Sequence, residues 1–518
     1  MVMSTVGFGM TVWSALIVVA APKPMNIGLV ETGEASRLRN KVAQGESKVP
    51  LSKTVFGITD QEMEQVKLIK KDIDNIAMKI HKRPVQVQKT SKEPDNVLGD
   101  IAYTAVQLAA IKRQLTGHGQ RRRRGISLVH NRWPLGKPIP YTFDETSKRP
   151  IPTAQRDVVR AALAAWEEAT CIRFQYFLPS SLPDSTYLNF TGAWDGCWSY
   201  VGMLYHTPGY PRSQPVNLDP SCFDVLLGVG RIVHEVGHAL GLWHEHTRYD
   251  RDKHVVINWD AIKAGMEGNF AKQEGDNKGT PYDYGSIMHY VPTSFANTTV
   301  SSTTIEPMES VYKNSMGQRF KLAFGDIKVI NAVYCADTCN GIPAPTCKNG
   351  GYQDPVKCNE CKCPDGLKGS AYCAEPAPHK MDVCGWKITL TNVPEMTTIE
   401  SPNSALVYQT YKEFQECNWL IQSPPGSKIL FEFVPKIPTY YAMALTHYVS
   451  GLCIDYVEIK HTLDFGRTGQ RFCGFYHTLT FPAIISESNQ ALVLFRANYP
   501  YNFSNKLGFK LHVQSVPS

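Results

Sequence analysis

The stretch that decides the fold reads HEVGHALGLWH, from His234 to His244, and it follows an apolar run of helical character, Val225 to Val233. On an α-helix, residues four apart lie on the same face, so His234 and His238 can present two imidazoles to one metal ion. Gly241 can take a left-handed conformation, end the helix and turn the chain back. His244 then supplies a third nitrogen, and we predict a zinc site.

Three neutral nitrogens leave one position of a tetrahedral zinc open, which is typical of a catalytic rather than a structural site. We expect a water molecule there, with Glu235 beside it. By composition, the five-residue core of the motif arises by chance in roughly two chains per hundred, and the full spacing to His244 in roughly one per twenty thousand. Histidines satisfied within or on a helix are the alternative interpretation. Other histidines, such as His206, His254 and His289, receive no role.

Two segments carry a resemblance to a known family. The histidine motif with the following EHTRYDRD, Glu245 to Asp252, resembles the extended signature of astacin metalloproteases, and SIMHY, Ser286 to Tyr290, is similar to their Met-turn. The resemblance implies that Met288 forms the floor beneath the zinc. It also implies that Tyr290 is a fifth ligand, which leaves the metal when substrate enters and then donates a hydrogen bond to the developing oxyanion. Core packing is the alternative for both side chains.

The same resemblance implies peptide-bond hydrolysis by a zinc metalloendopeptidase. Zinc polarises the scissile carbonyl and a water molecule, while Glu235 takes the water proton and later returns it to the leaving amine. No comparable motif supports a covalent serine or cysteine mechanism. A non-catalytic extracellular binding protein that keeps a protease fold is the alternative function. The intact set of three histidines and Glu235 argues against it.

A second family motif lies near the N-terminus. VLGDI, Val97 to Ile101, is similar to the Phe-x-Gly-Asp motif of astacin prosegments, with Val97 in place of Phe. By resemblance, Asp100 occupies the water position on zinc in a zymogen. Gly99 lets the backbone approach the cleft closely. An exposed loop aspartate is the alternative.

Four consecutive arginines, Arg121 to Arg124, follow this motif. In a secreted chain such a cluster is typical of a cleavage site for a trafficking convertase, and a solvated basic loop is the alternative. Cleavage after Arg124 frees Gly125. By family resemblance, the new N-terminus pairs with Glu245, directly or through water.

Length and charge limit the classes of protein. A chain of 518 residues exceeds what one hydrophobic core usually organises, so several domains are expected. The formal net charge is +7, and all of the excess lies before residue 125, where 20 Lys and Arg face 11 Asp and Glu. The rest of the chain is slightly acidic, so nucleic acid is not an expected partner. A hydrophobic content of 43% excludes global disorder.

Cysteine usage indicates an oxidising compartment, because there are 14 cysteines and none precedes Cys171. The apolar stretch Thr5 to Ala21 predicts a secretory signal, with a retained type II anchor, and hence a membrane-tethered sheddase, as the alternative. We expect a secreted, extracellular protein without stable membrane insertion. Three triplets are candidate glycosylation sites, at Asn189, Asn297 and Asn502.

The remaining cysteines resemble two kinds of module. Six between Cys339 and Cys373 resemble an EGF-like module, although sequence alone allows fifteen pairings. A zinc site built from three of them is the alternative, which a secreted context disfavours. The last four lie in segments similar to a CUB domain, and whether Asp455 helps to bind calcium stays open. The resemblances imply these disulfides: Cys171–Cys335, Cys197–Cys222, Cys339–Cys358, Cys347–Cys361, Cys363–Cys373, Cys384–Cys417 and Cys453–Cys473.

We therefore expect an α+β fold, an astacin-like metzincin catalytic domain, with an N-terminal propeptide, a small disulfide-rich EGF-like module and an all-β CUB sandwich. Local patterns predict a helix over Pro152 to Thr170, between strands Ile139 to Phe143 and Ile172 to Phe177. They also predict strands at Ile429 to Val434 and Tyr456 to Lys460. The expected parts are a signal peptide (1–21), a propeptide (22–124), the peptidase domain (125–336), the EGF-like domain (337–379) and the CUB domain (380–518).

This order of modules resembles the matrix-directed astacins of nematodes. The resemblance implies one Zn²⁺ in the catalytic domain and protein substrates in the extracellular matrix. Cuticle procollagen processing, moulting and digestion of an egg envelope are the tasks of that group, and residues alone do not choose among them.

Overall fold

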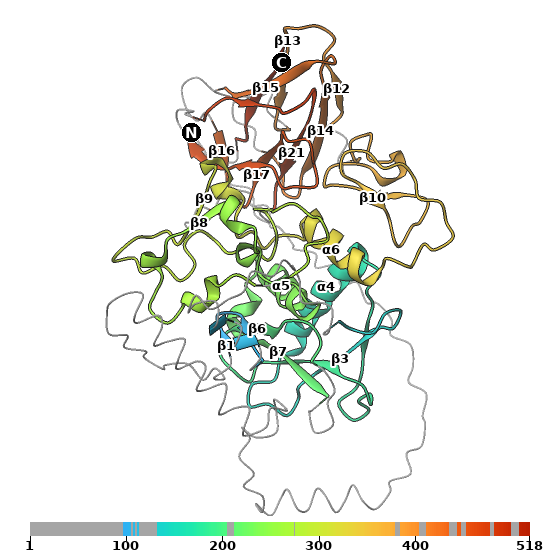
Figure 1. Ribbon diagram of the computed structural model, residues 1–518, viewed down its shortest axis with the longest axis vertical. Helices are drawn as coiled ribbons and strands as arrows, with labels where there is room; N and C mark the ends of the chain where they lie inside the picture. Colours follow the sequence, from blue (N-terminus) through green and yellow to red (C-terminus); the bar gives the residue numbers. More distant parts are fainter. Residues whose placement is uncertain are drawn as a thin grey trace, which may run out of the picture. The chain divides into compact units, whose positions relative to one another are not determined.

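A computed structural model describes residues 97–104, 107–108, 111–112, 132–204, 212–273, 275–378, 384–402, 411–434, 443–446, 452–476, 481–498 and 507–518. The predicted signal peptide, Arg124, Gly125 and Asn502 lie outside these residues. We refer to residues 132–335, together with the two short strands at 97–102 that join their sheet, as the α+β region, to 336–378 as the cysteine-rich segment and to 384–518 as the β-sandwich (Figure 1). Within the described ranges, no helix combines the length and apolar character needed to cross a membrane.

The α+β region is built on one sheet with strand order β1-β2-β6-β7-β5-β3-β4. Strands β5, β3 and β4 run parallel to β7, whereas β6 is antiparallel to it. The central strand β7 is buried at five consecutive positions, so both of its faces are covered. The strands are β1 (Val97–Leu98), β2 (Ile101–Ala102), β3 (Ile139–Phe143), β4 (Phe174–Tyr176), β5 (Tyr187–Thr191), β6 (Cys197–Tyr200) and β7 (Ser213–Leu218).

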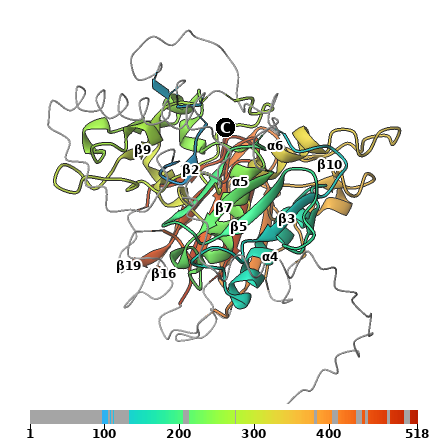
Figure 2. The same cartoon turned by 90° about the horizontal axis from the view of Figure 1, so that it is seen from below.

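Three helices complete this core: α4 (Thr153–Ala169), α5 (Gly228–Ala239) and α6 (Phe324–Tyr334). One apolar cluster joins the sheet to all three helices, with Trp166 of α4 and Val236 of α5 fully buried in it. Figure 2 shows α4 and α5 alongside β3, β5 and β7. Burying α5 in this way fixes the helix that carries the histidine motif.

Residues 251–316 form the second half of the α+β region around a separate aromatic cluster, which includes Tyr282, Tyr284 and Tyr290. Among the described residues of this range, regular structure is limited to short helical turns and to one antiparallel pair of strands distant in sequence, β8 (Val255–Ile257) and β9 (Ile305–Pro307). The segment is therefore organised by ring packing more than by a backbone ladder.

The cysteine-rich segment contains the hairpin β10 (Tyr352–Gln353) with β11 (Cys361–Lys362). The β-sandwich has two sheets around one core, with orders β12-β14-β21-β17-β18 and β13-β22-β15-β20. A separate two-stranded sheet pairs β16 with β19 in antiparallel orientation. The strands are β12 (Lys387–Thr389), β13 (Glu395–Glu400), β14 (Glu416–Gln422), β15 (Ser427–Phe433), β16 (Met443–Leu445), β17 (Tyr456–Lys460), β18 (Gln470–Phe472), β19 (Gly474–Tyr476), β20 (Ile484–Ile485), β21 (Gln490–Arg496) and β22 (Lys510–Pro517).

All fourteen cysteines are disulfide-bonded, and the pairs are those that the family resemblance implies. Of the two described glycosylation candidates, Asn297 lies in a surface turn, where its Oδ1 accepts hydrogen bonds from Thr299. Asn189 instead lies within β5, between β3 and β7, with a buried amide oxygen. The geometry favours Asn297 as the acceptor, because a glycan needs an exposed side chain.

The element bounds differ from the sequence prediction in several places. Helix α4 lacks the first and last residue of the predicted range, and β15 runs from Ser427 to Phe433 where 429–434 is predicted. Helix α5 begins at Gly228, three residues after the start of the apolar run, because Asp224 Oδ1 accepts hydrogen bonds from the backbone of Leu226 and Leu227 and holds a turn there. The strand expected at 172–177 is confined to β4. Strands β3 and β17 have the predicted bounds.

Candidate active site

Helix α5 presents three side chains of the motif to one place. His234 and His238 lie one turn apart, and both are almost fully buried. After the helix, Gly241 has a φ of +109°, which an L side chain rarely adopts. The chain turns there, and His244 returns to the same place.

The three imidazoles converge on a common point. His238 Nε2 lies 3.1 Å from His234 Nε2 and 3.2 Å from His244 Nε2. Nitrogens that bind one zinc ion at about 2.0 Å in a tetrahedron lie about 3.3 Å apart. The separations therefore fit three ligands of one ion.

Hydrogen bonds behind the rings hold the free nitrogens toward that point. His234 Nδ1 donates to the Ile287 carbonyl at 2.8 Å, and His238 Nδ1 donates to the Leu242 carbonyl at 2.8 Å. Burial lowers the pKa of His234 to about 4 and that of His238 well below its ordinary value. Both rings are thus neutral, with Nε2 lone pairs available, and the donor set fits zinc.

Glu235 lies next to this cluster, and one of its two carboxyl oxygens is buried without a hydrogen-bond partner among the described residues. Its side chain is 2% exposed, and this oxygen is Oε2. Burial, then the negative charge of Asp100, raises its pKa well above the ordinary value, and Arg319 opposes this shift. A buried carboxyl with a raised pKa is suited to taking and returning a proton.

The motif at Val97 to Ile101 lies against the histidines. Asp100 Oδ2 lies 3.2 Å from His234 Nε2, and Asp100 Oδ1 lies 3.0 Å from His244 Nε2. The Tyr290 hydroxyl donates to Asp100 Oδ1 at 2.8 Å. These four metal-ligating groups, one carboxylate and three imidazoles, form one compact cluster.

Gly99 is needed for this approach. Its φ is +60°, and a Cβ there would lie 2.5 Å from Asn269 Oδ1 and 3.0 Å from the Tyr290 hydroxyl. No larger residue fits without displacing one of them. Strand β2 then continues parallel to β6, and Ser199 N donates to the Asp100 carbonyl at 3.1 Å.

Met288 lies in the core against α5. It is 1% exposed, and a Cβ added to Gly237 of α5 would lie 2.9 Å from its sulfur. Tyr290 packs at 4.2 Å between ring centroids on His246, in a stacked geometry. The segment 286–290 thus supports both the helix and the phenol that reaches Asp100.

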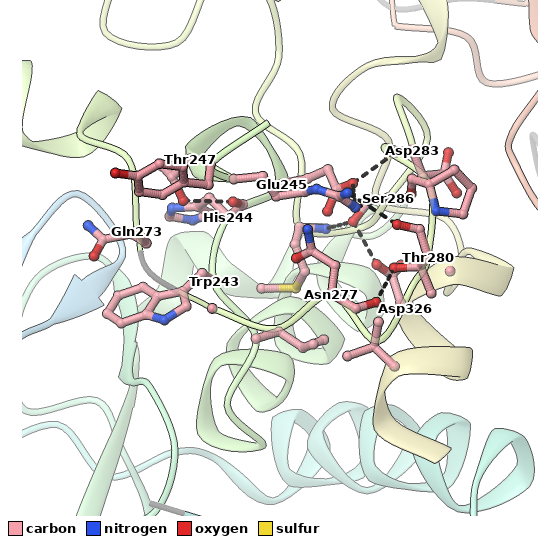
Figure 3. A pocket seen from close by; sticks show the side chains of 18 residues that line it. Trp243, His244, Glu245, Thr247, Gln273, Asn277, Thr280, Asp283, Ser286 and Asp326 are labelled. Atoms are coloured by element: carbon pink, nitrogen blue, oxygen red, sulfur yellow. Dashed lines mark hydrogen bonds and ion pairs between the residues drawn. The ribbon is translucent and has the colours of Figure 1, made fainter. Parts of the chain in front are cut away.

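Glu245 lies in a partly open cavity of about 40 Å³, which His244 and Met288 also line. Figure 3 shows Glu245, Asp283, Ser286 and Asp326 along its wall. Glu245 Oε1 accepts a hydrogen bond from Arg248 Nη1 at 3.0 Å and from Asp283 N at 2.8 Å. Burial raises the pKa of Glu245 to about 7, although Arg248 opposes the shift.

The sequence does not predict three of the residues that line the cleft or the cavity. Arg319 is half-buried and lines an open cleft of about 560 Å³ together with Asp100 and Tyr290. Asp283 and Asp326 line the cavity around Glu245. No spacing signal marks them, because they are far from the histidine motif in sequence and meet it only in the folded chain.

Comparison with known proteins places these regions among described families. The family model for the astacin peptidases matches residues 126–335, and a CUB domain model matches residues 384–512. The zinc metalloproteinase dpy-31 of Caenorhabditis elegans is 37% identical over 425 residues, which cover 81% of this chain and 66% of that protein. The dpy-31 protein of Brugia malayi is 33% identical over 500 residues, covering 89% of this chain and 78% of that protein.

Among solved structures, high choriolytic enzyme 1, a hatching enzyme zinc-protease of Oryzias latipes, is 29% identical, with a TM-score of 0.35. That alignment covers 41% of this chain and 98% of the fish protein. The chain spans about two thirds of the length of the Caenorhabditis relative.

Proposed function

Because the chain belongs to the astacin family of zinc metallopeptidases, we propose that it is a secreted zinc endopeptidase made as a zymogen. The observation that carries the proposal is the convergence of three buried imidazole nitrogens beside the carboxyl of Glu235. His234, His238 and His244 would hold the ion. When bound, zinc supplies Lewis-acid polarisation of the scissile carbonyl and of a water molecule.

The residues of the chain do the remaining chemistry. Glu235 takes the proton of the attacking water and returns it to the leaving amine. The Tyr290 hydroxyl, which donates to Asp100 in this structure, donates to the carbonyl oxygen of the substrate once Asp100 has left. Met288 supports the base of the site through its contact with α5.

We propose that Asp100 keeps the enzyme latent. Its carboxylate lies against two of the three histidines and accepts the Tyr290 hydroxyl, so it occupies the space that substrate and water need. Cleavage after Arg124 by a trafficking convertase would release this segment and create an N-terminus at Gly125. The cavity around Glu245 is the site proposed for that N-terminus, because an ammonium group there would satisfy a buried carboxyl.

Substrates are proposed to be proteins of the extracellular matrix, such as cuticle procollagen or an egg-envelope protein. The cysteine-rich segment is proposed to be an EGF-like module, and together with the β-sandwich it would contact such substrates. This assignment rests on the module order and on the nematode metalloproteinase relatives.

The central experiment compares the activated chain with its Glu235→Ala variant. We expect turnover of gelatin or casein by the wild type, and a loss of kcat of about 10²- to 10⁴-fold in the variant, with zinc content unchanged. Glu306→Ala, at an exposed position of β9, is the matched control and should turn over at the wild-type rate. Equal turnover by wild type and Glu235→Ala, with or without a chelator, would reject the hydrolase and favour a binding protein.

A further inference from the structure

The connection between β17 and β18 of the β-sandwich contacts the α+β region next to the Glu245 cavity. Thr468 N donates to Asp283 Oδ1 at 3.1 Å, in a buried hydrogen bond. The Thr468 side chain fills the space beside Gly285, where an added Cβ would lie 2.3 Å from Thr468 Oγ1. Ser315 Oγ donates to the Gly469 carbonyl at 3.0 Å. The contact thus includes both backbone and side-chain atoms.

The β-sandwich holds this connection in a fixed position. Gly469 N donates to Glu458 Oε1 at 2.9 Å, and Arg471 Nε donates to Glu458 Oε2 at 2.8 Å. Glu458 is 2% exposed and lies within β17. A buried, charge-assisted pair of this kind fixes geometry, so the position of Thr468 follows the sheet.

Asp283 links the connection to the cavity. Its backbone N–H donates to Glu245 Oε1, while its Oδ1 receives Thr468 N and Gly285 N. Its Oδ2 is buried and has no hydrogen-bond partner in the part of the chain that the structure describes. The same segment continues through Ser286 to Met288 and Tyr290. A shift of Asp283 therefore reaches both the cavity and the active site.

The charges of the cavity suit a cation with several N–H donors. Glu245, Asp283 and Asp326 line it, and one guanidinium, that of Arg248, faces them. A volume of about 40 Å³ accommodates a few water-sized groups. An α-ammonium group has this size and chemistry, and it would supply a donor for Asp283 Oδ2.

We infer that Thr468 of the β-sandwich is a positioning residue for the peptidase: it holds Asp283 in place so that the cavity accepts the new N-terminus. The inference rests on the proposed docking of Gly125. It gives the β-sandwich a task inside the chain, namely completing the activated enzyme. A peptidase with a displaced Thr468 would be cleaved normally but would respond less to a correctly formed N-terminus.

The test compares two activated forms of the full chain. The Gly125 form begins at Gly125, and the extended form keeps two extra residues before Gly125, left by an engineered activation site. Gly285→Ala displaces Thr468, because all three of the nearest atoms to the new Cβ belong to the Thr468 side chain. Adding Thr468→Gly removes those atoms and restores the space. Leu463→Ala, at a 73% exposed position of the same connection, is the matched control.

We expect the Gly125 form to be more active and to melt at a higher temperature than the extended form in the wild type. Gly285→Ala should lower kcat/KM about tenfold in the Gly125 form and little in the extended form. The difference in melting temperature between the two forms should also become smaller in this variant. Thr468→Gly should restore the advantage in the double variant, and Leu463→Ala should keep it.

The outcomes that overturn the inference can be told apart. A Gly285→Ala loss of equal size in both forms, or no loss in either, shows that Thr468 does not act through the cavity. A loss that Thr468→Gly fails to restore shows that the contact is not its cause. If the Gly125 form and the extended form of the wild type have equal activity and equal melting temperature, the docking of Gly125 is rejected and this inference with it. The proposed hydrolase would still be supported if Glu235→Ala abolishes the activity of both forms.

Discussion

At the scale of single residues, Asp100 is the side chain whose removal should change activity most clearly before cleavage. Its carboxylate contacts His234, His244 and Tyr290 at 3.2 Å or less. In a chain whose four arginines are replaced so that it stays uncleaved, Asp100→Ala should raise peptide turnover by about tenfold or more, because the carboxylate no longer occupies the point where the three imidazoles converge. A fluorogenic peptide assay measures this.

Asp100→Asn is the conservative partner of that variant. It keeps an oxygen acceptor for Tyr290 but loses the charge, so we expect activity between the parent and Asp100→Ala. If uncleaved Asp100→Ala is as inactive as its parent, the carboxylate does not cause latency, and another part of the prosegment must block the cleft.

The sequence could predict the histidines because their chemistry depends on local spacing. His234 and His238 lie one helical turn apart, and Gly241 returns His244 to them within six residues of the chain. Arg319 and Asp283 could not be predicted in this way. They reach the site through tertiary packing, and nothing in the residues around them distinguishes a cleft side chain from an ordinary surface charge.

At the scale of elements, the start of α6 carries a group that should make stability depend on pH. Asp326, in the first turn, accepts hydrogen bonds from Ala323 N, Ile287 N and Ser286 Oγ. Burial raises its pKa from 3.8 to about 6 despite these bonds, and the charge of Asp283 contributes. Glu245 is the other acidic group that interacts with it.

The sign follows from the raised pKa. Below pH 3.8 both the folded and the unfolded states carry the proton, so Asp326 has no effect on stability; as the pH rises to about 6, only the unfolded state loses it. Ionisation in the folded state then costs about 3 kcal/mol. Asp326→Asn should remove this cost, so the unfolding free energy of the variant relative to wild type should rise between pH 4 and about 6, as urea titrations measure.

Asp337→Asn, at an exposed aspartate after α6, is the control and should leave that difference flat. A flat difference for Asp326→Asn as well would show that Asp326 is ionised in the folded state at the same pH as in the unfolded chain.

Element bounds show where local patterns stop being sufficient. β3 and β17 could be predicted because each is a short run rich in β-branched and aromatic residues. The start of α5 could not. Its apolar run extends to Val225, which is 85% exposed, because a side-chain turn at Asp224 outweighs the helical pattern.

At the scale of the whole molecule, Asp365 of the cysteine-rich segment joins the other two regions. It pairs with Lys321 of the α+β region and with Arg496 Nη2 of the β-sandwich at 3.2 Å. Both cations hold its pKa well below the ordinary range, although burial acts in the opposite direction. Asp365→Ala should lower the unfolding free energy by about 1–2 kcal/mol, because Arg496 is 2% exposed and loses a charged partner.

Glu360→Ala tests whether any lost ion pair in this segment has the same effect. Its pair with Lys357 is exposed and 3.9 Å long, so we expect the unfolding free energy to change by less than about 0.5 kcal/mol. Urea titrations of both variants and the wild type measure these changes. Similar losses for both variants would show that Asp365 has no special place in the assembly of the three regions.

The astacin and CUB regions could be predicted from their family motifs, but the contacts between the regions could not. Leu367 of the cysteine-rich segment packs with Leu420, Leu492 and Leu494 of the β-sandwich, and these leucines lie on strands whose other face forms the sandwich core. A strand buried on both faces has no alternation that tells the two sides apart. The sequence therefore predicts the sandwich but gives no sign that the cysteine-rich segment covers one face of it.

The parallel pairing of β2 with β6 has a consequence for the life of the protein. While residues 101–102 are in place, the border of the sheet is covered by the chain itself, and the main-chain groups of β6 face a partner. Release of residues 101–102 would expose the edge of β6, to which an extended polypeptide can add as a strand through main-chain hydrogen bonds, whatever its side chains. Under the proposed activation, cleavage after Arg124 would therefore expose this edge of the sheet at the same step that releases Asp100 from the histidines.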